Sequence, residues 1–369
     1  MSNPIRVAIL GQGRSGRDIH GALLSKLDTF KIVAVNDVDE TRRERAVKEY
    51  GCQADEDCLA FLGREDIDLI INALPSHLHA PVTLEYLRNG QDVLTEKPTA
   101  ATAAEVDQLT LTAKAAGANL YFFQNLRFAP WFTAAREILD SGVLGRPVQY
   151  SFRSNTFARR WDWQTLQCNM AGSLRNTGPH PMDQAVVLMN TTAMPDIFCH
   201  FDRVNTYGDA EDFAKVLMRV PGGPVVDLEI SSCDRFPGPS LHVAAQYGTL
   251  KADANAVTYH YYDPASAPKQ VLIREPIQQP DGTPAYCRET LEWIEKTIDL
   301  KAVNIIGGQP AAGPVETFYN KLYAHIRHGA AFEITAQQVR LQVAIMEECH
   351  RQFPMASLDD QTLTIRVGE

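Results

Sequence analysis

Short apolar runs alternate with longer mixed stretches along the first third of the chain. The apolar runs predict buried strands, and the mixed stretches, whose apolar residues recur at helical spacing, predict helices. The predicted strands cover residues 7–10, 31–36, 67–72, 91–96 and 119–124, and the predicted helices cover 17–27, 39–50, 81–89 and 101–116. This alternation predicts parallel pairing in a doubly wound α/β sheet, whose ligands bind at the carboxyl ends of the strands.

The pattern changes at about residue 127. After one predicted helix at 131–141, strands with period-two alternation follow, which predicts an α+β domain on a largely antiparallel sheet with one covered face. The clearest of these strands are 148–154, 213–220, 225–231, 241–247 and 257–261. Two last helix-like stretches, 317–327 and 336–353, have apolar spacing suited to packing on that sheet. The most loop-like segment is 276–284, and we expect two domains, residues 1–126 and 127–369.

Three glycines at a characteristic spacing end the first predicted strand, and Asp37 ends the second. Gly11 would permit the tight strand-to-helix turn, Gly13 a close approach of pyrophosphate to the backbone, and Gly16 close packing of helix on strand. Asp37 follows about 20 residues further on, where a carboxylate accepts hydrogen bonds from an adenosine ribose. The sequence therefore predicts a dinucleotide site, lined by Gly11, Gln12, Gly13, Arg14, Ser15, Gly16 and Asp37.

Composition narrows the class of protein. The 369 residues are 45% hydrophobic and 22% charged, which is typical of a globular protein with a large core. The net charge of −10, without a basic block, argues against a nucleic-acid or anionic-membrane partner. The seven cysteines form no CxxC pair, so we expect reduced thiols in a cytoplasmic protein and no metal site. No signal peptide or membrane-spanning run is recognisable, since no apolar run approaches about 18 residues.

The tripeptide Glu96-Lys97-Pro98 directly follows a strand whose end faces the predicted crevice. Pro98 biases Lys97 away from helical dihedrals, so the lysine would point into the site beside a nicotinamide. There its ammonium could hold a substrate oxygen and stabilise developing negative charge. A surface Glu–Lys ion pair at the end of a strand is the alternative interpretation.

The segment 171–183 contains glycines, Asn176 and His180, and Asp183 follows just before an apolar helix-like run. If a helix starts near Pro181, His180 lies at its mouth and Asp183 in its first turn. Histidine is the side chain best suited to proton transfer near neutral pH. His180 could instead be an ordinary loop residue, and Asp183 a carboxylate that interacts only with the helix dipole.

Taken in order, these motifs resemble the glucose–fructose oxidoreductase / inositol dehydrogenase / MocA family of two-domain nicotinamide enzymes. The resemblance covers nearly the whole chain and includes Leu74-Pro75-Ser76-x-x-His79, Arg127 with Pro130, and closing segments around 318–322 and 334–338. It implies an N-terminal Rossmann domain and a C-terminal domain for substrate binding and oligomerisation. The Glu-Lys-Pro motif with a distant Gly…His-x-x-Asp is fairly specific to the family, whereas the glycine spacing alone is not.

The resemblance also implies roles for individual residues. Lys97 would bind the reacting oxygen and His180 would exchange its proton, with Asn176 and Asp183 beside them. The further residues that would frame the dinucleotide, NAD, are Leu74, Pro75, His79, Glu96 and Asn125. The chain departs from the family at Asn176, where the usual residue is an aspartate. Because asparagine cannot favour imidazolium by charge, either His180 works with a lower pKa or Asp183 supplies the charge.

The segment 159–163 offers a further candidate surface. Aromatic faces stack on the apolar C–H faces of sugars, and arginine hydrogen-bonds hydroxyls, so Arg160 and Trp161 would suit a pyranoside or cyclitol. A surface loop anchored by two tryptophans is the alternative. The remaining histidines have no metal-ligand spacing and are expected to be structural or solvated: His20, His200, His242, His260, His325, His328 and His350.

These features predict an NAD-dependent dehydrogenase that acts on a secondary hydroxyl, or the matching ketone, of a sugar, glycoside or cyclitol. Two alternatives stay open. One is an enzyme that retains NAD and cleaves a glycosidic bond through transient oxidation, and the other is a non-catalytic dinucleotide-binding regulator. Asp37 should repel a 2′-phosphate, which predicts preference for NAD over NADP, although Arg42 and Arg43 lie nearby. We also expect a homo-oligomer, a dimer or tetramer, because an open apolar sheet face is normally covered.

Overall fold

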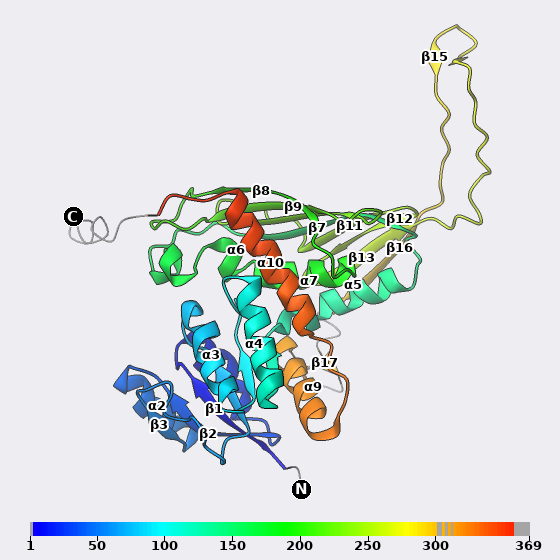
Figure 1. The fold of residues 1–369 in the computed structure, drawn as a ribbon. Coiled ribbons are helices and arrows are strands. Elements are labelled where there is room, and N and C mark those ends of the chain that lie inside the picture. Colours follow the sequence, from blue (N-terminus) through cyan, green and yellow to red (C-terminus); the bar gives the residue numbers. More distant parts are fainter. Residues whose placement is uncertain (1–2, 301–304, 307–308, 311–312, 358–369) are drawn as a thin grey trace.

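A computed structural model describes residues 3–300, 305–306, 309–310 and 313–357. Six parallel strands form the first sheet, in the order β3–β2–β1–β4–β5–β6 (Figure 1). Their bounds are β1 Ile5–Leu10, β2 Phe30–Asn36, β3 Gln53–Asp55, β4 Leu69–Asn72, β5 Val93–Thr95 and β6 Leu120–Phe122. β3 was not expected from the sequence, because its three residues carry no apolar run. The strand order reverses between β1 and β4, which is where a doubly wound sheet binds its ligands.

Helices follow most of these strands. They are η1 Arg14–Gly21, α1 Ala22–Leu24, α2 Glu40–Tyr50, η2 Ser76–Leu78, α3 His79–Arg88 and α4 Ala103–Ala116. The helix expected from residue 17 begins at Arg14, directly after the glycine turn. α4 has defined ends, because Thr102 and Glu105 form a capping box and Gly117 closes it with a φ of +69°.

The second sheet has eight strands, in the order β16–β13–β12–β11–β7–β10–β9–β8. Their bounds are β7 Pro147–Asn155, β8 Asp196–Asp202, β9 Phe213–Arg219, β10 Val225–Ser231, β11 Leu241–Ala245, β12 Gly248–Ala252, β13 Ala256–Tyr261 and β16 Ile294–Asp299. Only β7 and β10 pair in parallel, and the other neighbours are antiparallel. This matches the expected α+β domain with a largely antiparallel sheet, although β8, β12 and β16 were not predicted.

Helices cover one face of this second sheet (Figure 1). They are α5 Pro130–Asp140, α6 Ser173–Asn176 and α7 Pro179–Met189, and short turns lie at η3 Asn125–Phe128, η4 Trp163–Thr165 and η5 Gln167–Asn169. Two-residue strands complete the assignment, β14 Ile277–Gln278 with β15 Pro284–Ala285 and β17 Ile305–Ile306 with β18 Gln309–Pro310.

The two last helices do not both pack on the second sheet, as their apolar spacing suggested. α9 (Pro314–His328) packs against the first domain, where the Tyr319 ring meets Phe30 at 5.2 Å between centroids and Phe318 meets Phe123 at 4.8 Å. α10 (Ala336–Gln352) contacts α4 of the first domain and also α7 and β8 of the second. The expectation was wrong for α9 because an apolar stripe specifies burial but not the partner sheet.

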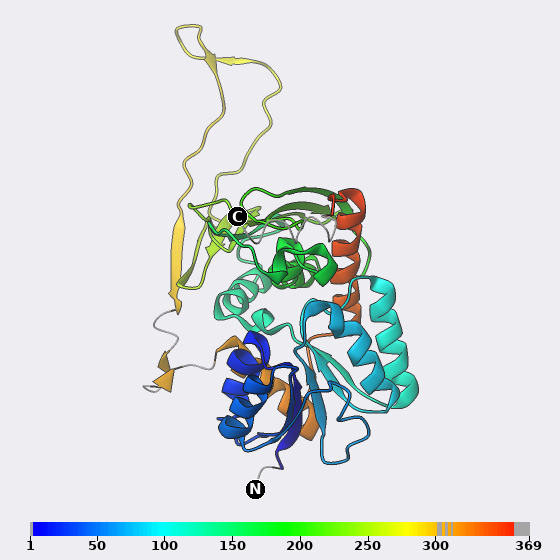
Figure 2. The same ribbon diagram turned by 90° about the vertical axis from the view of Figure 1, so that its left-hand side faces the viewer.

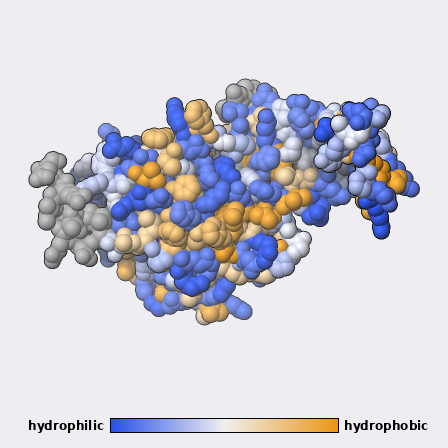
Figure 3. All heavy atoms as spheres, turned by 90° about the horizontal axis from the view of Figure 1, so that it is seen from above, coloured by the Kyte–Doolittle hydropathy of each residue, from blue (hydrophilic) through white to orange (hydrophobic). Residues whose placement is uncertain are grey.

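The other face of the second sheet is open and bears charges rather than a uniform apolar surface. Arg153, Lys215, Asp227 and Glu229 form a half-buried cluster, with Lys215 Nζ 2.7 Å from an Asp227 oxygen and 2.9 Å from a Glu229 oxygen. Figure 3 looks down on this face and shows hydrophilic and hydrophobic residues interspersed. The open face therefore carries charged side chains together with exposed apolar ones, since Phe198 is 62% exposed and Val225 40%.

Residues 262–293, between β13 and β16, leave the sheet as a long arm on the side away from the helices (Figures 1 and 2). The segment 276–284, expected to be the most loop-like, lies at the far end of this arm, where β14 and β15 form a short hairpin. In the described ranges, no helix has the length and apolar character needed to cross a bilayer.

Candidate active site

The glycine turn after β1 has the geometry that a dinucleotide requires. Gly11 has a φ of +84°, and a Cβ added there would lie 2.6 Å from the carbonyl oxygen of Ala73. A Cβ on Gly16 would lie 1.8 Å from the carbonyl oxygen of Gly11, whereas a Cβ on Gly13 would meet nothing within 4 Å. The turn is therefore packed by Gly11 and Gly16 and leaves open space at Gly13, which fits the close approach of a pyrophosphate.

Asp37 lies at the carboxyl end of β2, beside this turn. Its side chain is buried, and its two oxygens accept hydrogen bonds from the backbone N–H of Gln12 at 2.8 Å and of Asp39 at 2.9 Å. Arg42 reaches back from α2, with its Nη1 3.4 Å from an Asp37 oxygen. Arg43 donates instead to the backbone oxygens of Asp37 and Val38, so the carboxylate side chain has one arginine neighbour at this edge.

The turn from Leu74 to His79, which follows β4, is held by its histidine. The Nδ1 of His79 lies 2.7 Å from the carbonyl oxygen of Pro98, and its Nε2 lies 2.8 Å from that of Leu74. Burial lowers the pKa of this imidazole. Because each ring nitrogen contacts a different carbonyl oxygen, His79 links the turn that contains Pro75 to the loop that follows Lys97. Through this link it holds the backbone of both segments in place at the crevice. Asn125 lies at the start of η3, just beyond β6, and is buried.

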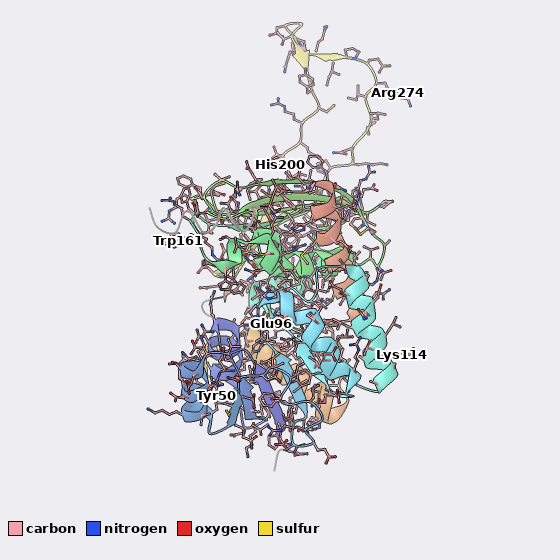
Figure 4. The ribbon with its side chains drawn as sticks, turned by 60° about the vertical axis from the view of Figure 1, so that its left-hand side comes forward. Tyr50, Glu96, Lys114, Trp161, His200 and Arg274 are labelled. Carbon is pink, nitrogen blue, oxygen red and sulfur yellow. The ribbon has the colours of Figure 1, made fainter. Side chains whose placement is uncertain are left out.

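Glu96 is buried between the two domains, where Figure 4 labels it, and a set of polar side chains surrounds it. One carboxylate oxygen lies 3.2 Å from Nε2 of His20 and also accepts from the hydroxyl of Ser15, and the other accepts from the N–H of Lys97 at 2.8 Å. The Nδ1 of His20 is 2.6 Å from the hydroxyl of Tyr319 on α9. Burial opposes ionisation of Glu96, but His20, Lys97 and Ser15 outweigh it and hold the pKa of this carboxyl well below its usual range.

His20 and Tyr319 were not recognised from the sequence as parts of this arrangement. His20 was grouped with structural or solvated histidines, and Tyr319 lay in a helix expected on the other sheet. The one available signal was the spacing, since His20 follows Gly16 by four residues and so returns to the same side of the helical segment η1.

Lys97 reaches across the boundary between the domains to the segment that carries His180. The Nζ of Lys97 donates to the backbone carbonyl oxygen of Asn176 at 2.8 Å. Burial lowers the pKa of this ammonium group, and the negative charge of Glu96 offsets part of that lowering. Burial and then the charge of Lys97 lower the pKa of His180 to about 3. The Nδ1 of His180 is buried and has no hydrogen-bond partner among the described residues.

Asn176 and Asp183 have other partners than the sequence suggested. The amide of Asn176 donates to the carbonyl oxygen of Gln164 at 2.9 Å, so its backbone rather than its side chain faces Lys97. α7 begins at Pro179, which places His180 in the first turn and Asp183 in the second. Both oxygens of Asp183 accept from the guanidinium of Arg127, with Nε at 2.9 Å. Of the two alternatives for His180, the lowered pKa is the one that these contacts favour.

Arg127 is the centre of a buried junction. Its Nη1 also donates to Gln338 on α10 at 2.7 Å and to the carbonyl oxygen of Glu333 at 2.8 Å. The side chain is 2% exposed and so depends on Asp183 for charge balance. The pair therefore fixes α7, and with it His180, against the helix that bridges the domains.

The loop of residues 159–164, which contains Trp161 and Trp163, lies beside the site, but the side chain of Trp161 turns outward. Gln164 of this loop contacts Asn176, while Arg160 donates to the carboxylate of Asp162 at 2.8 and 2.9 Å. Trp161 is 77% exposed and lies at the side of the second domain (Figure 4). Within the described ranges, no group of three or more His, Cys, Asp or Glu side chains is arranged to hold a metal ion.

Comparison with known proteins gives two family matches. A model described as an oxidoreductase family with an NAD-binding Rossmann fold matches residues 5–123, and a GFO/IDH/MocA C-terminal domain model matches 132–251.

Similar curated proteins include the NADP⁺-dependent scyllo-inositol 2-dehydrogenase IolW of Bacillus subtilis, 25% identical over 93% of each chain. Inositol 2-dehydrogenase 4 of Saccharopolyspora erythraea is 32% identical over 40% of this chain and 45% of its own. An uncharacterised oxidoreductase of Schizosaccharomyces pombe is 32% identical over 51% of this chain and 52% of its own. The chain thus matches about half the length of the last two relatives.

Solved structures share the fold along nearly the whole chain. An NAD-binding protein from Listeria innocua has a TM-score of 0.75 at 18% identity, covering 97% of this chain and 100% of its own. The WlbA dehydrogenase from Bordetella pertussis, solved with NADH and UDP-GlcNAcA, has a TM-score of 0.72 at 16% identity, with coverage of 97% and 100%.

Proposed function

Because the chain belongs to the GFO/IDH/MocA family of NAD-binding oxidoreductases, we propose that it oxidises a secondary hydroxyl of a sugar, glycoside or cyclitol, or reduces the matching ketone. The observation that carries this proposal is the position of Lys97, whose Nζ donates to the carbonyl oxygen of Asn176, four residues before His180, and whose charge lowers the pKa of His180. An inositol dehydrogenase among the relatives, aligned along 93% of the chain, supports the substrate class.

The glycine turn fits NAD, because Gly13 leaves space for the pyrophosphate and Asp37 lies beside the position of the ribose. When bound, NAD accepts or returns the hydride of the carbinol carbon. Glu96, held by His20 and Ser15, fixes the start of the loop from which Lys97 extends. The remaining residues of the chain hold the substrate and move its proton.

In the oxidation direction, Lys97 exchanges its hydrogen bond with Asn176 for one with the substrate hydroxyl and stabilises negative charge on that oxygen. The imidazole of His180, uncharged at neutral pH because of its lowered pKa, takes the hydroxyl proton. Asp183 acts through Arg127 as a positioning residue for α7, and Asn176 positions Lys97 through its carbonyl oxygen. Arg160 and Trp161 line the outer edge and contact only the part of a substrate that extends beyond the reacting ring.

This proposal can be tested with a panel of cyclitols, sugars and glycosides. Each compound is incubated with the protein and NAD, and both net NADH formation and the products are measured. Net NADH together with a ketone is the expected result. Products without net NADH would indicate a glycoside-cleaving enzyme that retains its cofactor, and NAD binding without turnover across the panel would indicate a regulator.

Cofactor choice is tested separately by calorimetry. Asp37 is buried and already accepts two backbone hydrogen bonds, so it stays in place against a 2′-phosphate. We expect NAD to bind more tightly than NADP by about tenfold or more. Equal or tighter binding of NADP would show that Arg42 rather than Asp37 determines the ribose site.

A further inference from the structure

Three buried polar side chains connect α9 to the backbone of Lys97. The hydroxyl of Tyr319 lies 2.6 Å from Nδ1 of His20, and Nε2 of the same ring lies 3.2 Å from one oxygen of Glu96. The other oxygen of Glu96 accepts from the N–H of Lys97 at 2.8 Å. Tyr319 and His20 are 0% exposed and Glu96 is 4% exposed, so water does not compete for these contacts.

The hydroxyl of Tyr319 is the polar group of an otherwise aromatic environment. The Tyr319 ring meets Phe30 at 5.2 Å and Phe318 at 5.5 Å between centroids, and Phe123 packs on His20 at 4.5 Å. Burial and the charge of Glu96 raise the pKa of Tyr319 well above its usual value, so the hydroxyl keeps its proton. Because a buried hydroxyl destabilises the fold unless it is hydrogen-bonded, a phenylalanine would suit this packing better unless the contact with His20 is needed.

His20 is the main partner that keeps Glu96 ionised. Carboxylate oxygens only accept hydrogen bonds, so the Nε2 that faces Glu96 carries a hydrogen. Burial raises the pKa of Glu96, and the hydrogen bond from His20 comes first among the effects that outweigh it, ahead of Lys97 and Ser15. This hydrogen bond requires one orientation of the ring, which Tyr319 fixes at Nδ1. Without that hydroxyl, a ring that turns to find another partner for Nδ1 takes Nε2 away from Glu96.

Lys97 depends on Glu96 for its charge. Burial lowers the pKa of the Lys97 ammonium, the charge of Glu96 raises it, and Arg14 of η1 lowers it again. Burial and the charge of Lys97 in turn lower the pKa of His180 on α7. Since a neutral amine would not stabilise negative charge on a substrate oxygen, Glu96 keeps Lys97 in the form that the reaction uses.

We propose that Tyr319 is a positioning residue for Lys97 and acts through His20 and Glu96. Its hydroxyl holds the His20 ring toward Glu96, and Glu96 holds the backbone and the charge of Lys97. This role rests on the proposed function, in which Lys97 binds the reacting oxygen. Tyr319 lies outside the residues that either family model matches, and it gives α9 a part in the chemistry of the crevice.

The pKa of Lys97 tests this role without any substrate. It is measured in the full-length protein from the pH dependence of Lys97 acetylation by acetic anhydride, followed by mass spectrometry. Tyr319→Phe removes only the hydroxyl, and the pKa of Lys97 should be lower than in the wild type by about 0.5–1. His20→Leu also removes the donor to Glu96 and should lower it by about 1 or more. His20→Gln, whose amide can donate to Glu96, should restore most of that loss.

Tyr323→Phe is the matched control. Tyr323 lies one turn further along α9, and its ring also meets Phe30, at 6.0 Å. Its hydroxyl takes no part in the contacts of His20 or Glu96 among the described residues. This substitution should leave the pKa of Lys97 within about 0.2 of the wild-type value. Circular dichroism should show the same fold for this variant and for Tyr319→Phe, because each loses one oxygen atom.

Turnover separates this role from the proposed function. On the substrate found in the panel, kcat of Tyr319→Phe should fall by about tenfold, because Lys97 is less well placed and less often charged. A shifted pKa of Lys97 in a protein that turns over no compound of the panel would contradict the proposed function and leave the positioning role in place. An active wild type whose Lys97 pKa is unchanged in Tyr319→Phe and His20→Leu would overturn the positioning role. An equal shift in Tyr323→Phe would overturn it as well, since it would show a general effect of packing by α9.

Discussion

The crevice of the first sheet and the open face of the second both contain charged side chains, but these side chains differ in burial and in hydrogen bonding. In the crevice, Glu96 and Asp37 are buried and accept hydrogen bonds from fixed donors. On the open face, Lys215 and Glu229 are half-buried, and their ion pair is reached by water. Because water cannot screen a buried charge, its interactions with fixed donors are strong and hold it in one position. A group held in this way suits a site that must orient a substrate. A screened charge contributes little energy and mainly determines which surface it can face.

The sharpest contrast lies between two Arg–Asp pairs, and we expect the largest effect there. Asp183→Asn removes the partner of the buried Arg127 and should lower the free energy of unfolding by about 3–5 kcal/mol. Asp196→Asn breaks the exposed pair with Arg219 on the open face and should lower it by about 1 kcal/mol or less. Urea denaturation of both variants measures the two values. Similar losses would contradict the contrast between the two regions.

The second prediction concerns turnover in the crevice. Lys97→Ala and His180→Ala should each lower kcat by about 100-fold or more, the usual scale for losing a charge donor or an acid–base group. NAD affinity should change much less for His180→Ala, because this residue belongs to the second domain. Steady-state kinetics on the substrate found in the panel give the first value and calorimetry the second. Near wild-type turnover of His180→Ala would remove it from the mechanism.

A third prediction separates packing from binding within one turn. Gly16→Ala places a Cβ against the carbonyl oxygen of Gly11 and should lower the free energy of unfolding by about 1–3 kcal/mol. Gly13→Ala meets open space at a φ of −72° and should leave stability within about 0.5 kcal/mol. Its NAD affinity should nevertheless fall by about tenfold or more, because the methyl group occupies the approach of the pyrophosphate. Thermal melts without NAD and calorimetry with it test both parts.

The smallest expected effect depends on pH. Burial raises the pKa of Glu211, beneath α6, to about 7, so the folded state favours its protonated form. The stabilisation that the protonated Glu211 gives to the folded state is fully present below about pH 4.5 and is lost as the pH rises through about 7. Glu211→Gln stays uncharged, so its stability relative to the wild type should improve between pH 5 and pH 8, by about 1–3 kcal/mol.

Glu229→Gln on the open face is the matched control for this pH dependence. Lys215 and Asn155 outweigh partial burial and lower the pKa of Glu229. This substitution should therefore remove a small stabilisation that is present at both pH 5 and pH 8, and the difference between the two pH values should be near zero. A shift of the same size and sign as that of Glu211→Gln would point to a general effect of net charge.

Local patterns predicted the first domain better than the second. The turn from Gly11 to Gly16 and the strands on either side follow from spacing within a few residues, and both appear as expected. β16 was missed because its exposed residues Glu295, Lys296 and Thr297 interrupt any alternation. The partners of Asn176 and Asp183 were also beyond the sequence, because Gln164 and Arg127 reach them from distant segments.

The position of Tyr319 has a consequence for the order in which the chain folds during synthesis. The nucleotide domain is made first, yet α9, which covers His20 and Phe123, is made nearly 200 residues after β6. Until that helix is made, His20 lacks the hydroxyl of Tyr319 and Phe123 lacks the ring of Phe318. Domains usually fold as they emerge, N-terminal first. Here the first domain to emerge remains incomplete until almost the last helix leaves the ribosome.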